Sequence, residues 1–329
     1  MKILHEKTHS CRRFAWRYGA KRRRCSICGK TWTVWPKKRG RKHSRPDKSL
    51  LKKVFVERQR LKQTAAVRLK RISLSAASQR FQKALISNNH SPDRLTFRGL
   101  FYILVIDALW HCFNGQRWTL YLGAARNISG TRAKLLPPFL VQGKESLTGW
   151  RLFIDTLPQS LKKRLKAVIS DGWRGVDTLA KENRWLLQRC HFHFLAQLKI
   201  NRGKWKCLPN QTLREAIRQN AIKLLSTKNR VNFYKERLLF LISQPKCPNR
   251  LKIIIRDYLR HLKYFRSCLN HPKLNLPNTT NSMESINNLI REQCRYLNNP
   301  SSLARWSKSF IKIKGQVACN KAKSYTELT

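Results

Sequence analysis

Residues 102–107 constrain the fold of this chain most, because they form a run of bulky apolar residues that ends in a carboxylate. A short run rich in Ile and Val is typical of a strand buried on both faces of a sheet. A carboxylate there must be hydrogen-bonded, paired with a cation or bound to a metal, since a bare buried charge is costly. The sequence therefore predicts a buried strand whose last residue, Asp107, either caps a turn or belongs to a site built with other parts of the chain.

Two further acids stand in similar places. A second short apolar strand, residues 167–171, ends at Asp171 and is followed by a glycine, which is a turn signal. Glu284 begins a helix, where it would also fit a capping box with Asn281 as the N-cap. Three such acids, in a chain with only 16 acidic residues, suggest one metal-binding site formed by Asp107, Asp171 and Glu284. Carboxylates that converge from separate elements can hold two divalent ions about 4 Å apart, and oxygen ligands favour Mg²⁺ or Mn²⁺.

The charge of the chain indicates a polyanionic partner. The 329 residues include 70 Lys and Arg against 16 Asp and Glu, so that 70 − 16 gives a formal net charge of +54. Self-repulsion of this size is best tolerated on nucleic acid, and we expect double-stranded DNA. The apolar runs are shorter than the roughly 20 residues that a membrane-spanning helix needs, and residues 1–6 lack the apolar region of a signal peptide. We therefore expect a cytoplasmic, nucleoid-associated protein without a membrane partner.

Residues 1–46 predict a zinc-ribbon-like module with a basic linker. Cys25 and Cys28 form a Cys-x-x-Cys turn that lets two thiolates face one ion. A tetrahedral Zn²⁺ site needs two more ligands, and the candidates are Cys11 with His9 or His5. The alternative is a pair of thiols without a metal in a basic arm. The linker that follows carries cations expected to contact DNA phosphates, namely Lys37, Lys38, Arg39 and Arg41.

Within residues 47–98, the stretch 47–86 has a helical period that is interrupted at residues 72–75, and a turn-rich boundary follows at residues 88–93. A helix, a short break and a second helix with polar side chains are typical of a helix-turn-helix, whose second helix reads the major groove. The residues expected to face DNA are Ser78, Gln79 and Arg80. Any antiparallel helix pair gives a similar pattern, so that alternative stays open.

Beyond residue 98 the pattern changes to alternating strands and helices. The strand over residues 99–107 is followed by another over residues 117–124, and Asn114-Gly115 between them is a hairpin signal. A helix is predicted over residues 144–157, and further strands lead to Asp171 and to residue 189. The pattern predicts a mixed α/β sheet over residues 99–200, an all-helical insertion over 201–278, and a helix with a basic C-terminal segment over 279–329.

Cys190 and His193 follow the last predicted strand directly. Taken alone, this Cys-x-x-His pair is better explained by packing at a strand-to-helix junction than by zinc, because no second cluster lies near it in the sequence.

With these motifs in order, residues 99–291 resemble the Mutator-like superfamily of DDE transposases, which includes bacterial insertion-sequence enzymes. The resemblance rests on the strand ending in Asp107, on Ser170-Asp171-Gly172, on Cys190-x-x-His193, and on the Thr280–Asn287 stretch around Glu284. It implies a ribonuclease-H-like core in which Asp107, Asp171 and Glu284 are the catalytic acids. Cys190 and His193 match a signature pair of the family, whose role the resemblance leaves open.

The resemblance also implies an N-terminal zinc ribbon followed by a helix-turn-helix. The first knuckle departs from the family pattern, because Cys11 with His9 or His5 stands where a second Cys-x-x-Cys is expected. The function expected from the sequence is a metal-dependent transposase that binds the ends of its element and acts on DNA as a homodimer or larger assembly. The alternative is a non-catalytic DNA-binding regulator derived from a transposase.

Overall fold

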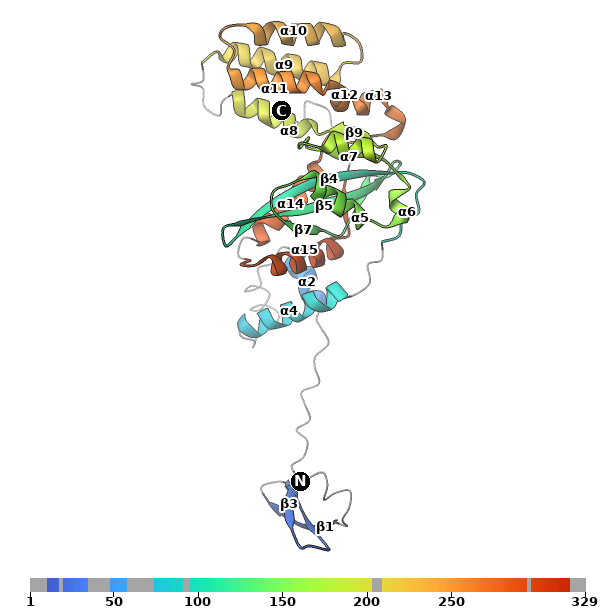
Figure 1. The fold of residues 1–329 in the computed structure, drawn as a ribbon, viewed down its shortest axis with the longest axis vertical. Coiled ribbons are helices and arrows are strands. Elements are labelled where there is room, and N and C mark those ends of the chain that lie inside the picture. The colour runs from blue at the N-terminus through green and yellow to red at the C-terminus, as the bar shows by residue number, and fades with distance from the viewer. Residues whose placement is uncertain are drawn as a thin grey trace. The chain divides into compact units, whose positions relative to one another are not determined.

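A computed structural model describes residues 11–17, 20–34, 48–57, 74–90, 95–202, 209–294 and 297–319. The chain divides into two units, Met1–Asp47 and Lys48–Thr329 (Figure 1). Within the described ranges, none of the helices has the length and apolar character needed to cross a membrane.

The N-terminal unit contains a three-stranded antiparallel sheet with the order β1 (Cys11–Arg17), β2 (Ala20–Cys25) and β3 (Thr31–Val34). The register of β1 and β2 places Cys11 directly opposite Cys25. The turn between β2 and β3 is closed by the Cys25 amide, which donates to the Lys30 carbonyl at 2.9 Å. Gly29 in this turn has a φ of +67°, a left-handed conformation that favours glycine.

The larger unit is built on a mixed sheet, which confirms the predicted α/β class. Its central hairpin joins β4 (Tyr102–Phe113) to β5 (Gln116–Asn127) through Asn114 and Gly115, whose φ values of 48° and 76° suit the two-residue turn that the sequence predicts. The antiparallel strands on the β5 side are β6 (Arg132–Leu135), β7 (Phe139–Gln142) and β10 (Gln316–Ala318). On the other side of β4, two strands run parallel to it, β8 (Leu165–Ser170) and β9 (Leu186–Arg189). The order is β10-β6-β5-β4-β8-β9, with β7 also paired to β5.

The prediction that Asp107 ends its strand is wrong. β4 continues for six residues to Phe113, because the Asn114-Gly115 turn lets the whole segment pair with β5, where Asp107 lies opposite Leu122. The parallel pairing with β8 ends earlier, at Val105 opposite Ile169. Asp107 therefore stands in the middle of β4 but just beyond the point where β4 and β8 part.

One face of the sheet is covered by α5 (Leu147–Asp155), α6 (Gln159–Lys162) and α7 (Val176–Glu182), which share a core with β4 and β8. Helix α5 begins where the Ser146 hydroxyl accepts a hydrogen bond from the Gly149 amide at 3.1 Å, a side-chain N-cap. Its Trp150 and Phe153 are fully buried against the sheet.

The opposite face is covered by α2 (Lys48–Phe55), α4 (Leu74–His90), α14 (Asn281–Cys294) and α15 (Pro300–Lys314). Phe55 of α2 packs edge-on against Trp306 and Phe310 of α15, with ring centroids 4.8 and 5.7 Å away. The basic C-terminal segment predicted from the sequence thus contains an amphipathic helix whose apolar side belongs to the core.

The helical region has a core of its own. Figure 1 shows its four longest helices stacked in layers next to β9. They are α8 (His191–Arg202), α9 (Gln211–Ser226), α10 (Val231–Ser243) and α11 (Asn249–Arg260), and the shorter α12 (Leu262–Phe265), α13 (Ser267–Asn270) and η1 (Pro272–Leu274) lead back towards the sheet. Helix α8 begins directly after β9, ten residues before the helical region predicted from the sequence.

Candidate active site

Asp107 is the buried acid of the site. Its residue is 5% exposed, Oδ1 accepts a hydrogen bond from the Ala108 amide at 2.9 Å, and the buried Oδ2 atom has no hydrogen-bond partner. Burial raises the pKa of Asp107 to about 8, with a further increase from the negative charges of Asp171 and Glu284, while His193 and the Ala108 amide act in the opposite direction. Both other acids predicted from the sequence, Asp171 and Glu284, are therefore close enough to Asp107 to raise its pKa.

Asp171 lies next to Asp107 because of the sheet register. Val105 and Ile169 are the last paired residues of β4 and β8, and each acid stands two residues beyond that pair. Since side chains alternate along a strand, Asp107 continues the face that α14 covers. Ser170 donates its hydroxyl to Asp171 Oδ1 at 3.2 Å. Gly172 then turns the chain with a φ of +91°, at a point where a Cβ atom would lie 3.2 Å from Arg189.

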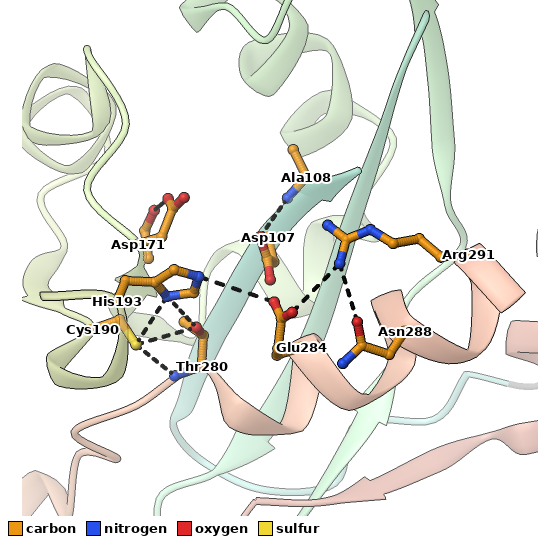
Figure 2. A network of polar contacts seen from close by, with 10 residues as sticks. Asp107, Ala108, Asp171, Cys190, His193, Thr280, Glu284, Asn288 and Arg291 are labelled. Atoms are coloured by element: carbon orange, nitrogen blue, oxygen red, sulfur yellow. Dashed lines mark hydrogen bonds and ion pairs between the residues drawn. The ribbon is translucent and has the colours of Figure 1, made fainter. Parts of the chain in front are cut away.

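Glu284 comes from the first turn of α14. The capping-box alternative is wrong, because the helix already begins at Asn281 and the Glu284 amide donates to the Thr280 carbonyl at 3.0 Å. Asn281 Oδ1 is instead buried without a hydrogen-bond partner. Glu284 Oε2 lies 4.0 Å from His193 Nε2, and Oε1 lies 3.5 Å from Arg291 Nη1. Figure 2 shows the carboxylates of Asp107 and Glu284 facing one another, with His193 beside Glu284.

Cys190 and His193 are part of the same site. Cys190 is 1% exposed, and its Sγ accepts hydrogen bonds from the amide and the hydroxyl of Thr280 at 3.2 and 3.3 Å. His193 Nδ1 lies 3.4 Å from this sulfur. Burial lowers the pKa of His193, but Cys190, Asp171 and Asp107 outweigh it and raise the pKa to about 9. The pair therefore does more than fill a strand-to-helix junction, because its histidine lies 4.0 Å from the Glu284 carboxylate.

The acids suit a divalent cation by their chemistry. Asp107 Oδ2 is an orphaned buried oxygen, and its neighbours are carboxylates, so a cation would relieve both the missing partner and the repulsion. Oxygen donors of this kind match Mg²⁺ or Mn²⁺. Within the described parts of the chain, no group of three or more His, Cys, Asp and Glu side chains is arranged to hold an ion as it stands.

The N-terminal residues are only partly described. Cys25 is buried and Cys28 exposed, and the Cys28 amide donates to Cys25 Sγ at 3.4 Å. Cys11 lies in β1, but its side chain is outside what the structure describes, as are residues His5 and His9. The linker cations predicted to contact DNA also lie outside the described residues, namely Lys37, Lys38, Arg39 and Arg41. On α4, Gln79 and Arg80 are exposed, Ser78 is half-buried, and Phe81 packs into the core.

Glu145 lies at the start of the segment 144–157, where the sequence predicts a helix, and it is not among the predicted site residues. Its Oε1 accepts a hydrogen bond from the Trp150 indole at 2.8 Å. Burial raises the pKa of Glu145 to about 7; Asp171 adds to this, and Trp150 and Arg117 oppose it. Glu145 is therefore a fourth carboxylate, close enough to Asp171 for the charge of Asp171 to raise its pKa. Nothing local in the sequence distinguishes it from a Glu at the start of a helix.

The fold and the site define an α/β protein with a carboxylate cluster where two parallel strands end. The sequence model described as "Transposase, Mutator family" matches residues 103–308, which is more than half of the chain and includes the three acids, Cys190 and His193. The protein therefore belongs to the Mutator family of transposases. No curated protein matches the chain.

Proposed function

We propose that this protein is a DDE transposase of an insertion sequence, which binds the ends of its element, cuts DNA there and joins the cut end to a target. The observation that carries the proposal is the buried Asp107 carboxylate, whose Oδ2 atom has no hydrogen-bond partner and whose pKa is raised to about 8 by burial and by the charges of Asp171 and Glu284. Acids that repel one another in this way persist at functional sites, where a cation or a substrate compensates for them.

The strand order supports a ribonuclease-H-like core. Three antiparallel strands, β6, β5 and β4, are followed by the parallel strands β8 and β9, and helices cover both faces. The helical region between β9 and α14 then corresponds to an insertion before the third acid. This arrangement explains how residues far apart in the sequence form one site.

The chemistry that we propose has two steps. In the first, a water oxygen attacks the phosphorus at the element end, the bond from phosphorus to the 3′-oxygen breaks, and that oxygen takes up a proton to become a 3′-hydroxyl. In the second, this hydroxyl attacks a target phosphodiester, forms a new ester bond and releases a target 3′-hydroxyl. Asp107, Asp171 and Glu284 would hold two Mg²⁺ or Mn²⁺ ions, which supply Lewis-acid polarisation and neutralise charge on the phosphate.

The excess of basic residues fits the DNA substrate. A charge of +54 favours association with the phosphate backbone, and this part of the affinity falls steeply with salt. We propose that α4 contributes to recognition of the element ends through Gln79 and Arg80. Because two ends must be brought together for transposition, the acting form is at least a dimer.

The N-terminal unit is proposed to bind Zn²⁺ through Cys25 and Cys28, with Cys11 and His9 or His5 completing the site. The hydrogen bond from the Cys28 amide to Cys25 Sγ and the position of Cys11 opposite Cys25 support this proposal. Metal analysis of the purified protein tests it. One zinc per chain, lost in Cys25→Ser with Cys28→Ser, is the expected result, and a zinc-free wild-type protein would contradict it.

The experiment that tests the catalytic proposal is cleavage of a supercoiled plasmid carrying the gene with its native flanks. Wild type is compared with Asp107→Asn, Asp171→Asn and Glu284→Gln in Mg²⁺, Mn²⁺ or chelator. Glu182→Gln is the matched control, because Glu182 is an exposed acid of α7 that pairs with Arg151. We expect metal-dependent breaks at the flanks with wild type and the control, and none with the other three. Tight DNA binding without cleavage in any metal would instead favour a non-catalytic regulator.

A further inference from the structure

We propose that His193 is a positioning residue, which holds the Glu284 carboxylate in the site while Cys190 and Thr280 fix the direction of its ring. This inference rests on the proposed catalytic role of Glu284. It gives the Cys-x-x-His pair a physical task that neither the motif nor the family match assigns.

Hydrogen bonds join the start of α8 to the segment that leads into α14. The Thr280 amide and hydroxyl both donate to Cys190 Sγ, at 3.2 and 3.3 Å, and the His191 amide donates to the Asn278 carbonyl at 2.8 Å. Thr280 is fully buried, so its amide needs a partner inside the protein, and the sulfur supplies the acceptor. Cys190 thus fixes the residue that directly precedes the helix carrying Glu284.

The His193 ring connects this anchor to the acid. Its Nδ1 atom lies 3.4 Å from Cys190 Sγ and 3.4 Å from Thr280 Oγ1. These contacts leave Nε2 on the opposite side of the ring, 4.0 Å from Glu284 Oε2 (Figure 2). Because two neighbours fix the Nδ1 side of the ring, the Nε2 atom points toward Glu284. A supporting residue can fix the orientation of a functional side chain in this way.

The spacing of the motif follows from this geometry. Cys190 directly follows β9, where its amide donates to the Ser170 carbonyl at 2.8 Å, next to Asp171. His193 lies three residues on, in the first turn of α8. The pair therefore links the end of the strand that precedes Asp171 to the first turn of α14, which carries Glu284.

Glu284 needs such support more than Asp107 does. Its side chain is 26% exposed, whereas Asp107 is buried in a strand. A partly exposed Glu side chain has several rotamers, and a misplacement of about 1 Å in a catalytic group can lower a rate about 10²-fold. Arg291 contacts the other carboxylate oxygen, so His193 and Arg291 restrict Glu284 from two sides.

Two variants of His193 test the contacts of the two ring nitrogens separately. In His193→Gln the amide nitrogen can occupy the place of Nε2 and contact Glu284, whereas in His193→Asn it can occupy the place of Nδ1 and contact only Cys190 and Thr280. Each variant is measured for single-turnover cleavage, for Mn²⁺ affinity by electron paramagnetic resonance without DNA, for DNA affinity and for Tm. Cys247→Ser is the control, because Cys247 is a buried thiol of the helical region.

We expect His193→Gln to keep cleavage and Mn²⁺ affinity within about 10-fold of wild type. His193→Asn should lose about 10²-fold in cleavage and bind Mn²⁺ more weakly, with DNA affinity and Tm like those of the Gln variant. Cys190→Ser, which keeps an acceptor for Thr280, should retain more cleavage than Cys190→Ala, and the control should match wild type.

The reverse order of the two His193 variants would overturn the proposal, because it would show that only the contact with Cys190 matters. Equal losses in both variants together with a lower Tm would also overturn it, in favour of a purely structural role. If wild type cuts no DNA in any metal, the catalytic proposal fails, and the order of the Mn²⁺ affinities of the two variants then decides the positioning role alone.

Discussion

The sheet and helix α14 hold the acids of the site in different ways. Asp107 belongs to a 12-residue strand paired along its whole length with β5, and the shared register with β8 sets Asp171 beside it. Glu284 stands on a helix surface, and the contacts that orient its carboxylate are side chains, His193 and Arg291. The sheet therefore fixes the positions of Asp107 and Asp171, at a cost in stability for the buried charge. The position of the Glu284 carboxylate on the helix depends instead on the neighbouring side chains.

The largest difference between the strand acid Asp107 and the helix acid Glu284 is expected in cleavage and Tm when the side-chain length is changed. Asp107→Glu forces an extra methylene into a buried strand position and should lower single-turnover cleavage by about 10³-fold and also lower Tm. Glu284→Asp keeps the charge but withdraws the carboxylate, and should lower cleavage by about 10²-fold without a change in Tm. Equal loss of Tm in both variants would show that Glu284 is as tightly packed as Asp107.

Arg126 connects the sheet to the approach of α14. It is fully buried in β5 and donates to the carbonyls of Asn275 and Cys319. Arg126→Ala leaves both carbonyls without this donor and creates a cavity, so the free energy of unfolding should fall by about 3 kcal/mol in a urea titration. Arg132→Ala, at an exposed position of β6, is the control and should change it by less than about 0.5 kcal/mol. A similar small change in both variants would show that the contacts of Arg126 do not stabilise the fold.

The buried charge of Asp107 should destabilise the metal-free protein. Its pKa is raised from 3.8 to about 8, so between these pH values the folded state binds more protons than the unfolded state, and stability falls as the pH rises. Asp107→Asn removes this effect. In chelator at pH 8 it should stabilise the protein on the order of 2 kcal/mol, and the gain should shrink towards pH 5.

Two comparisons check this prediction. Asp155→Asn, at an exposed position beside Lys162, should leave stability nearly unchanged at both pH values. Addition of Mn²⁺ should raise the Tm of wild type more than that of Asp107→Asn. A gain in Asp107→Asn that grows towards pH 5 would contradict the direction of the pKa shift.

The smallest effect is expected on the helix side. Arg291 is 48% exposed and pairs with Glu284 at 3.5 Å, and an exposed ion pair contributes less than about 1 kcal/mol. Arg291→Ala should therefore change the free energy of unfolding by less than that amount, as measured by urea titration, while His193 continues to contact Glu284. A loss above about 2 kcal/mol would mean that the carboxylate depends on Arg291 for the fold itself.

The sequence predicted the elements of the core because their patterns are local. The apolar runs before Asp107 and Asp171 and the Asn114-Gly115 turn each depend on neighbouring residues, and β4, β5 and β8 lie where these signals place them. The predicted end of β4 at Asp107 is wrong, because pairing with β5 continues the strand beyond this charged residue.

The parts of the site that the sequence could not supply depend on tertiary contacts. A capping box at Glu284 is plausible from the spacing, but the helix starts at Asn281, one residue earlier than an Asn281 N-cap requires, and the amide and hydroxyl of Thr280 donate to Cys190 Sγ. Glu145 looks like an ordinary helix-starting acid until the fold places it near Asp171. Likewise, only the fold shows that His193 contacts Glu284.

The most direct test of the account is a Mn²⁺ titration of the metal-free protein, followed by electron paramagnetic resonance, because the central claim is that the sheet and α14 build one metal site. Wild type is compared with Asp107→Asn, Asp171→Asn, Glu284→Gln and the control Glu182→Gln. The account predicts that each of the first three variants binds Mn²⁺ at least about 10-fold more weakly and that the control binds like wild type. Wild-type affinity in Glu284→Gln would show that the helix acid lies outside the metal site and would contradict the claim.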